Sequence, residues 1–364
     1  MKKRLLFIAG LLACSSFALP AQESIPGSDR MLTVSGRSLS RGDTLSFDWS
    51  GTEVRIRFQG RSLKMTCADS GADWFNVFID KPLSTSADKI LKVGKAGFRE
   101  VSLVEGARKG THDVIIQKRT EGEQGRLDIV SFETDGRFLQ ADGLRDRHIE
   151  FIGDSYTCGY GTEASNKERF SPETENQNLT YACESARFFG AEQIVLAHSG
   201  MGICRNYNGP LTEDNIVEHY LRTFDKDPEI AWDAHACAVK PDITVIYVGT
   251  NDFSRNMQPS ERKFVANYIS LLEEIKANYG DNHPILCISP KHDFLQVTYI
   301  RKAVETCGLA NVHFLGLSKI VHNEVSDLGA DGHPNYNGHT KIAYTVIPCI
   351  STIMGWEMTH SEIK

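Results

Sequence analysis

The sequence predicts an α/β fold in which a parallel sheet is covered by helices on both faces, preceded by an all-β sandwich. From residue 148 onward, short apolar runs alternate with stretches of helical periodicity, as in parallel sheets buried on both sides. Residues 22–145 instead show short runs of alternating polar and apolar residues, separated by glycine-containing turns, which is typical of antiparallel sandwiches. The 364-residue length exceeds that of a usual single domain. We therefore expect a sandwich domain over 22–145 and a catalytic-type α/β domain over 146–364.

Each expected element has a definite place in the chain. Strands of the first domain are expected at residues 52–58, 74–79, 98–104, 112–117 and 127–132. Strands of the second domain are expected at residues 148–152, 193–197, 243–248, 285–288 and 312–315. Helices are expected near residues 181–189, 261–279, 297–305 and 336–354.

The first 21 residues have the features of an export signal. A basic start over residues 1–4 precedes an apolar stretch and a run of small residues, and cleavage after Ala18 or Ala21 fits this pattern. Residues 11–14 also loosely resemble a lipoprotein signal, which would attach lipid to Cys14. We expect export to the periplasm or the cell exterior, as a soluble protein in preference to an outer-surface lipoprotein. No other apolar stretch approaches the ~20 residues of a spanning helix, so no transmembrane segment is expected.

Composition argues against several kinds of partner. The formal net charge is −7 and no run of Lys or Arg appears, which disfavours nucleic-acid binding. Nine cysteines include Cys14, and the other eight are scattered without Cys-x-x-Cys or zinc-ligand spacing. Their pairing stays open, although a cysteine in an apolar run, such as Cys287, is interpreted as a small buried hydrophobe. We expect neither a metal nor any other cofactor, and the oligomeric state cannot be derived.

Polar residues and glycines follow the expected strands of the second domain, where parallel sheets present their ligand sites. Ser155 follows the first strand, Gly200 the second and Asn251 the third, while Asp331 and His333 precede the last helix. A serine hydroxyl becomes a nucleophile when a histidine accepts its proton. The N–H groups of Ser155 and Gly200 and the amide of Asn251 are suitable donors for an oxyanion. Asp331 is a candidate for orienting the imidazole.

Each of these motifs has a plain structural alternative. A Gly-Asp-Ser sequence after a strand is commonly only a turn, and Asn251 could belong to a helix cap. One histidine among twelve is, by itself, more often a surface or core residue. The joint occurrence of the motifs, in this order and each beside an expected strand end or loop, favours acyl-transfer chemistry.

These blocks resemble those of the SGNH, or GDSL-type, hydrolases. Ser155, Gly200, Asn251 and His333 stand at the positions of that superfamily's serine, glycine, asparagine and histidine. The segments 151–161, 199–202 and 205–207, together with Glu175-Asn176 and Pro241-Asp242, further resemble carbohydrate esterase family 2. The resemblance covers nearly all of the chain after the signal. It implies a three-layer α/β/α domain preceded by a jelly-roll-like sandwich.

One departure from the superfamily pattern affects the histidine. The superfamily usually has an acid three residues before it, where this chain has Ala330, and Asp331 stands two residues before it. The resemblance implies that either Asp331 or a backbone carbonyl orients His333.

The leading functional hypothesis is a serine esterase that removes O-acetyl groups from a polysaccharide or oligosaccharide of the xylan or glucomannan type, through an acetyl-serine intermediate. An acetylated carbohydrate is then the partner. A lipase- or thioesterase-type SGNH hydrolase and a non-catalytic carbohydrate-binding protein are the alternatives.

Overall fold

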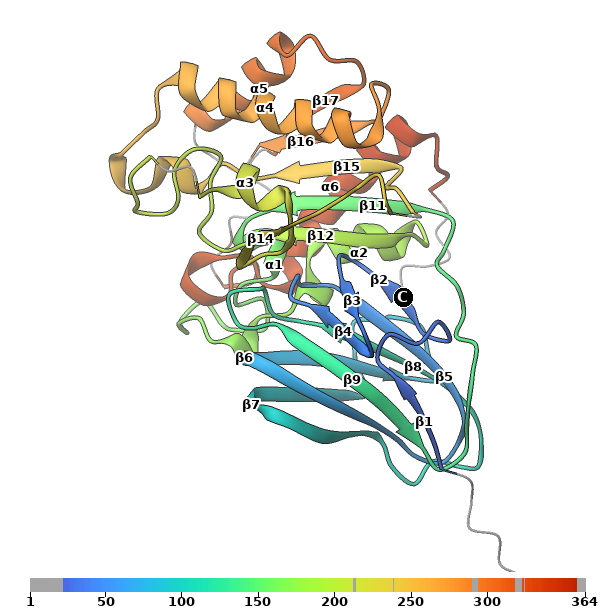
Figure 1. Ribbon diagram of the computed structural model, residues 1–364. Helices are drawn as coiled ribbons and strands as arrows, with labels where there is room; N and C mark the ends of the chain where they lie inside the picture. Colours follow the sequence, from blue (N-terminus) through green and yellow to red (C-terminus); the bar gives the residue numbers. More distant parts are fainter. Residues whose placement is uncertain are drawn as a thin grey trace, which may run out of the picture.

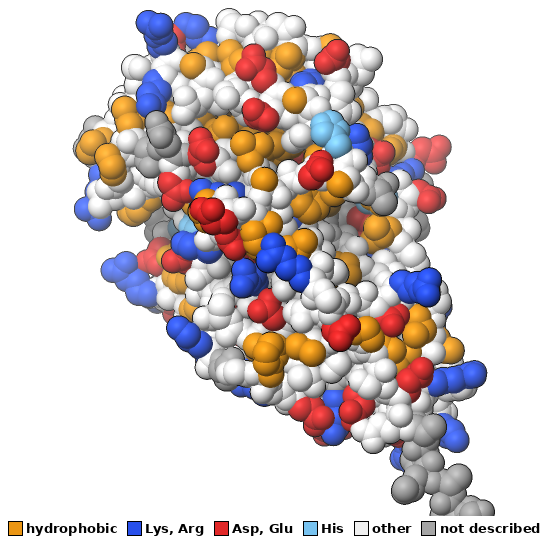
Figure 2. All heavy atoms as spheres, in the orientation of Figure 1, with side chains coloured by type: hydrophobic (Ala, Val, Ile, Leu, Met, Phe, Trp, Pro, Cys, Tyr) orange, Lys and Arg blue, Asp and Glu red, His pale blue; other side chains and the backbone are white. Residues whose placement is uncertain are grey.

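The computed structural model describes residues 22–358, except 212–213, 238, 290–293, 318–322 and 324. The expected signal segment, including Cys14, lies outside the described residues. Figure 1 shows a β-rich half formed by the first part of the chain, in contact with a half in which a sheet is packed against helices. The predicted fold class is therefore confirmed. In Figure 2, acidic and basic side chains are interspersed over both halves of the face in view.

The N-terminal half is built from antiparallel strands. Ten strands lie here, β1 (Glu23–Pro26), β2 (Thr33–Ser35), β3 (Leu39–Arg41), β4 (Thr44–Phe47), β5 (Glu53–Gly60), β6 (Leu63–Ile79), β7 (Lys89–Val104), β8 (Gly110–Lys118), β9 (Leu127–Thr134) and β10 (Arg137–Leu139). Their main order is β10-β5-β8-β6-β9-β4-β3, with β1 on β9, β2 on β5 and β7 on β6. All these pairings are antiparallel.

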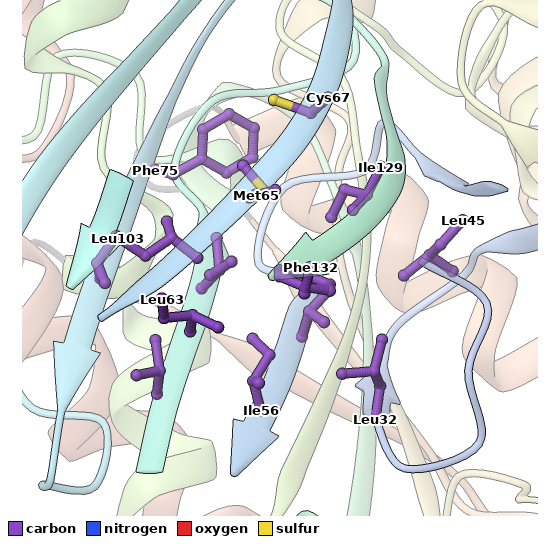
Figure 3. Packing of buried hydrophobic residues seen from close by; sticks show 14 of the residues in the cluster. Leu32, Leu45, Ile56, Leu63, Met65, Cys67, Phe75, Leu103, Ile129 and Phe132 are labelled. Atoms are coloured by element: carbon purple, nitrogen blue, oxygen red, sulfur yellow. The ribbon is translucent and has the colours of Figure 1, made fainter. Parts of the chain in front are cut away.

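The strands of this half enclose one hydrophobic core. Along β6, Leu63, Met65 and Cys67 are buried while the residues between them are partly exposed, because successive side chains of a strand point to opposite faces. Figure 3 shows these three converging with Phe75 and Phe132 between the strands. Burying one such large apolar side chain stabilises the fold by roughly 1.5–3 kcal/mol.

The C-terminal half is built on a parallel sheet of five strands. These are β11 (His148–Gly153), β12 (Glu192–Ala197), β15 (Ile243–Tyr247), β16 (Ile285–Ser289) and β17 (Val312–Gly316), in the order β12-β11-β15-β16-β17. Every pairing in it is parallel. The carboxyl ends of these strands therefore meet along one edge, which is where ligands bind in such sheets.

Helices cover both faces of this sheet. The α-helices are α1 (Ser155–Cys158), α2 (Tyr181–Phe188), α3 (Ile216–Tyr220), α4 (Glu261–Tyr279), α5 (Phe294–Thr306) and α6 (Tyr336–Met354), and short 3-10 turns lie at Pro172–Thr174, Gln177–Leu179, Asn251–Asn256 and Ala330–Gly332. One core joins the sheet to α2 and α6, and a second joins its other face to α3, α4 and α5. This arrangement is the expected three-layer α/β/α domain (Figure 1).

Two features of the fold were not expected from the sequence. β6 and β7 form one long hairpin whose register shifts between Cys67 and Ala72, where the exposed or partly exposed residues Ser70, Gly71 and Ala72 interrupt the alternation of buried and exposed side chains. A small hairpin, β13 (Arg222–Phe224) and β14 (Asp227–Ala231), stands apart from both sheets. Its strands are too short for an alternation pattern to be recognised.

The two halves meet through buried groups. Trp49 of the N-terminal half is fully buried in the hydrophobic core beside α4, and its indole N–H donates to the carbonyl of Thr223 at 2.9 Å. Arg55 binds Glu192 on β12 at 2.6 Å. In Figure 1, β12 is the strand of the parallel sheet that lies nearest to the β-rich half. A loop of the N-terminal half also reaches the carboxyl edge of the parallel sheet, where Glu121 accepts from the N–H of Ser199.

The eight cysteines after Cys14 are all described, and all are free thiols. Cys287 is fully buried in the core beside α4, as its apolar run predicts. None of the described helices is both long and apolar enough to cross a membrane.

Candidate active site

Ser155 lies at the start of the short helix α1, directly after strand β11. The Asp154 side chain caps α1 by accepting from the N–H of Tyr156 at 3.2 Å. A Cβ atom at Gly153 would lie 2.0 Å from Oγ1 of Thr157, so only glycine permits this tight passage from strand to helix. The turn places the Ser155 side chain at the carboxyl edge of the sheet.

The structure brings His333 to Ser155 from the opposite end of the domain. Its Nε2 atom lies 2.8 Å from Oγ of Ser155, which is a hydrogen-bonding distance suited to proton transfer. Its Nδ1 atom faces the carbonyl oxygen of Ala330 at 3.3 Å. Tyr160 covers one face of the imidazole with ring centroids 4.2 Å apart and is itself stacked on Phe170 at 4.0 Å. The ring is thus held by a backbone acceptor and by aromatic packing.

Asp331 is placed differently from the triad acid considered in the sequence. Its carboxylate accepts from Arg169 at 2.9 Å, from the hydroxyl of Tyr160 at 3.2 Å and from the N–H of Phe170 at 3.0 Å. The N–H of Phe170, followed by the Arg169 guanidinium, lowers the pKa of Asp331. Asp331 adopts a left-handed backbone conformation with φ of 49°. The carboxylate therefore anchors the segment around Tyr160, and the Ala330 carbonyl takes the place of the acid at Nδ1.

Two backbone N–H groups beside Ser155 are available to a ligand. Among the described residues, neither the N–H of Ser155 nor that of Gly200 has a hydrogen-bond acceptor. Gly200 has φ of 83°, a conformation that favours glycine. Unsatisfied donors near a nucleophile match what an oxyanion requires.

Asn251 lies in the same region but is partly engaged. Its Nδ2 atom donates to the carbonyl of Met201 at 2.7 Å and lies 3.4 Å from Oδ2 of Asp154. The first bond is strong and fixes the side chain, whereas the second is long and weak. Burial raises the pKa of Asp154 to about 7. The second N–H of Asn251, which makes only the long contact with Asp154, is therefore the one that can donate to a reacting oxygen at little cost.

The segment that carries Gly200 is held by two buried carboxylates of the C-terminal half. Asp252 accepts from the N–H groups of Ile203, Cys204 and Arg205 at 2.8, 2.8 and 3.0 Å. Asp225 binds Nδ1 of His198 at 2.6 Å.

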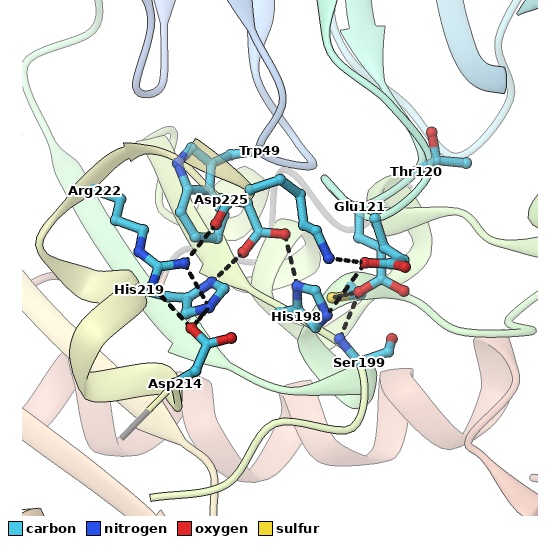
Figure 4. A network of polar contacts seen from close by, with 12 residues as sticks. Trp49, Thr120, Glu121, His198, Ser199, Asp214, His219, Arg222 and Asp225 are labelled. Atoms are coloured by element: carbon cyan, nitrogen blue, oxygen red, sulfur yellow. Dashed lines mark hydrogen bonds and ion pairs between the residues drawn. The ribbon is translucent and has the colours of Figure 1, made fainter. Parts of the chain in front are cut away.

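Two groups of potential metal ligands lie in the described part of the chain. One joins His198, His219 and Asp225, and the other joins Glu121, Cys158 and Glu175, with ligand atoms within 4.8 Å of one another. In the first, shown in Figure 4, both histidines bind Asp225 through Nδ1 at 2.6 Å, which is a hydrogen-bond distance rather than a spacing around an ion. Although burial opposes it, Asp225 raises the pKa of His198 to about 9. The group behaves as an ionic network.

Sequence reasoning missed two contributors to this site. Tyr160 belongs to the motif around Ser155, and its aromatic character was the available signal. Glu121 lies in a glycine-containing cluster that was interpreted only as a turn, and no sequence pattern relates it to a site more than thirty residues away.

Both halves of the chain match known protein families. Residues 34–141 match the family described as carbohydrate esterase 2 N-terminal, and residues 151–341 match the GDSL-like lipase/acylhydrolase family. The solved structure of a family two carbohydrate esterase from Clostridium thermocellum in complex with cellohexaose superposes with a TM-score of 0.81 and 30% identity, over 90% of this chain and all of that one. A family two carbohydrate esterase from Cellvibrio japonicus has a TM-score of 0.82 at 24% identity, covering 92% of this chain and 99% of that one.

Two proteins of known name are also similar over most of the chain. An acetylxylan esterase/glucomannan deacetylase of Cellvibrio japonicus is 28% identical over 93% of this chain and 95% of its own length. Cellulase/esterase CelE of Acetivibrio thermocellus is 32% identical over 85% of this chain, which spans only 38% of that protein. Fold and sequence thus define a GDSL-type, or SGNH, hydrolase. Within that class, the chain belongs to carbohydrate esterase family 2.

Proposed function

We propose that this carbohydrate esterase removes O-acetyl groups from polysaccharides or oligosaccharides of the xylan or glucomannan type. Residues 146–364 would form the catalytic domain, and residues 22–145 the sandwich domain. The observation that carries the proposal is the 2.8 Å approach of His333 Nε2 to Ser155 Oγ, beside two N–H groups with no acceptor among the described residues. The name of the similar Cellvibrio japonicus protein, acetylxylan esterase/glucomannan deacetylase, supports this substrate class.

The reaction is a double displacement. Ser155 Oγ attacks the acetyl carbonyl carbon as its proton passes to Nε2 of His333, and the carbonyl oxygen becomes an oxyanion. The N–H groups of Ser155 and Gly200, with the amide of Asn251, stabilise that charge. The intermediate then expels the sugar oxygen, which takes the proton from His333 and leaves an acetyl-serine. Water, deprotonated by His333, releases acetate by the same route and restores the hydroxyl.

In this mechanism a backbone carbonyl orients the imidazole. The Ala330 carbonyl accepts from Nδ1 of His333, which favours the tautomer with a free lone pair at Nε2. The aromatic stack of Tyr160 then limits rotation of the ring. Both contacts remain available when the imidazole becomes positively charged.

The substrate class is tested with a panel of esters. We expect acetate release from acetylated xylan and acetylated glucomannan. With 4-nitrophenyl esters, we expect kcat/KM to fall by at least about 100-fold between the acetyl and octanoyl compounds. Each methylene group that a pocket does not accommodate changes transition-state binding by roughly 1–3 kcal/mol. A preference for octanoyl would instead support a lipase-type enzyme, and glycan binding without any turnover would support a binding protein.

We further propose that residues 1–21 direct export, on the basis of their basic start, apolar stretch and small residues. The intact mass of the chain purified from its native cell distinguishes the routes. A mature N-terminus after residue 18 or 21 indicates soluble export, and a lipid-bearing Cys14 indicates anchoring. A full-length chain retained in the cytosol would contradict both.

A further inference from the structure

A loop of the N-terminal half reaches the back of the candidate active site. Residues 119–126 connect β8 to β9, and Glu121 in this loop is only 2% exposed. The buried ammonium group of Lys118 fixes the loop, because it donates to the carbonyls of Thr120 and Glu121 at 2.8 and 3.1 Å. The position of the Glu121 side chain is therefore set by the β-rich half.

The carboxylate of Glu121 joins two segments of the other half. Its Oε2 atom accepts from the N–H of Ser199 at 2.5 Å and from Sγ of Cys158 at 3.2 Å. Figure 4 shows Glu121 and Ser199 pointing toward each other, with His198 beside them. A single oxygen atom thus links the loop after β12 to the helix α1.

These two segments are the ones that carry the free N–H groups. Ser199 immediately precedes Gly200, and Cys158 ends the four-residue helix α1 that begins at Ser155. Because Glu121 accepts from the N–H of Ser199, it fixes the backbone immediately before Gly200. In this position the N–H of Gly200 has no acceptor among the described residues. The distance between the two prospective oxyanion donors therefore depends on a side chain from the first half of the chain.

Two buried ionisable groups, Glu175 and His198, interact electrostatically with the carboxylate of Glu121. Burial, followed by the charge of Glu121, raises the pKa of Glu175 well above its ordinary range. His198, with a pKa of about 9, is protonated at neutral pH. A charged carboxylate binds a backbone N–H about twice as strongly as a neutral acceptor does.

We propose that Glu121 is a positioning residue for the oxyanion hole, through which the sandwich domain sets the reactivity of the catalytic domain. The inference rests on the proposed esterase function. Displacing a donor by about 1 Å costs on the order of 100-fold in rate, and losing one costs 100- to 1,000-fold. The loss falls on kcat, because the donors bind the transition state more strongly than the ground state.

The experiment compares Glu121→Ala and Glu121→Gln with wild type on 4-nitrophenyl acetate. We expect kcat to fall about 100-fold in the alanine variant and about 10-fold in the glutamine variant, which retains an acceptor without the charge. KM should change less than threefold in both. Glu123→Gln is the matched control, since Glu123 lies in the same loop but forms a half-exposed ion pair with Lys226, and its activity should stay within twofold of wild type.

A second readout separates this inference from the esterase proposal. Diethyl 4-nitrophenyl phosphate phosphorylates an activated serine through a pentacoordinate state with negative charge on the phosphoryl oxygen. The Oγ–P bond forms as 4-nitrophenolate leaves, whatever the natural acyl substrate is. The rate of Ser155 modification per folded molecule should fall in parallel with kcat. Unchanged kcat and phosphorylation in Glu121→Gln would overturn the positioning role, as would a loss explained entirely by the unfolded fraction. If wild-type Ser155 reacts with the phosphate but no acetyl ester is cleaved, the esterase proposal fails while the positioning role is still measured.

Discussion

Replacing Ser155 with alanine is expected to abolish ester hydrolysis, lowering kcat by at least about 10⁴-fold. The expectation follows from the loss of the atom that forms the acyl-enzyme, since removing a serine nucleophile in other serine hydrolases costs up to about 10⁶-fold. Folding should be unaffected, because the alanine retains the Cβ atom and the backbone N–H that lie in the turn. Initial rates with 4-nitrophenyl acetate and a thermal melt of the same sample measure both effects.

The matched control for this variant is Ser165→Ala, which removes an exposed hydroxyl from the same domain. Its rate should stay within twofold of wild type. If Ser155→Ala kept more than a few per cent of wild-type activity, the catalytic hydroxyl would have to be another residue.

The second large effect is expected at His333, and it contrasts with a small effect at Asp331. His333→Gln should lower kcat by about 10⁴-fold, because no other base lies within hydrogen-bonding distance of Ser155 Oγ in the described part of the chain. Asp331→Asn should cost less than about 10-fold, since an amide oxygen can still accept from Phe170 and Tyr160. In an enzyme whose aspartate orients the histidine, the same aspartate-to-asparagine change costs about 10⁴-fold.

This pair of variants decides how the imidazole is oriented. A small loss in Asp331→Asn supports orientation by the Ala330 carbonyl. Equal losses in the two variants would show that the carboxylate acts on His333 after all. Thermal melts should accompany the kinetics, because Asp331 also anchors Arg169 and the Phe170 backbone.

Helices and strands with strong internal patterns could be predicted from the sequence. The ranges 261–279 and 336–354 coincide with α4 and α6, since each has a sustained helical period, and α4 has a serine cap at its start. The hairpin of β6 and β7 was predicted only in fragments, because its register shifts where Ser70, Gly71 and Ala72 interrupt the alternation of buried and exposed residues. A pattern read within one window does not carry across such a shift.

The prediction of the site was limited in a similar way. Ser155, Gly200 and Asn251 follow strands whose ends share one edge of a parallel sheet, so topology alone brings them near one another. The acceptor for His333 was left open, because the choice between a carboxylate and the Ala330 carbonyl depends on one left-handed residue at position 331. Glu121 could not be found, since contacts between domains leave no periodic signal in either segment.

The burial of Trp49 constrains how the molecule is assembled during synthesis. The indole belongs to a core made mainly from residues between 152 and 314, and Arg37 likewise donates to the carbonyl of Arg222 at 2.8 Å. The ribosome delivers the N-terminal half first, so both side chains emerge well over a hundred residues before their partners. Until then an aromatic anchor and a guanidinium remain in water on an otherwise finished β-domain. A β-rich half that forms before its partner is therefore expected to be prone to aggregation until the second half docks.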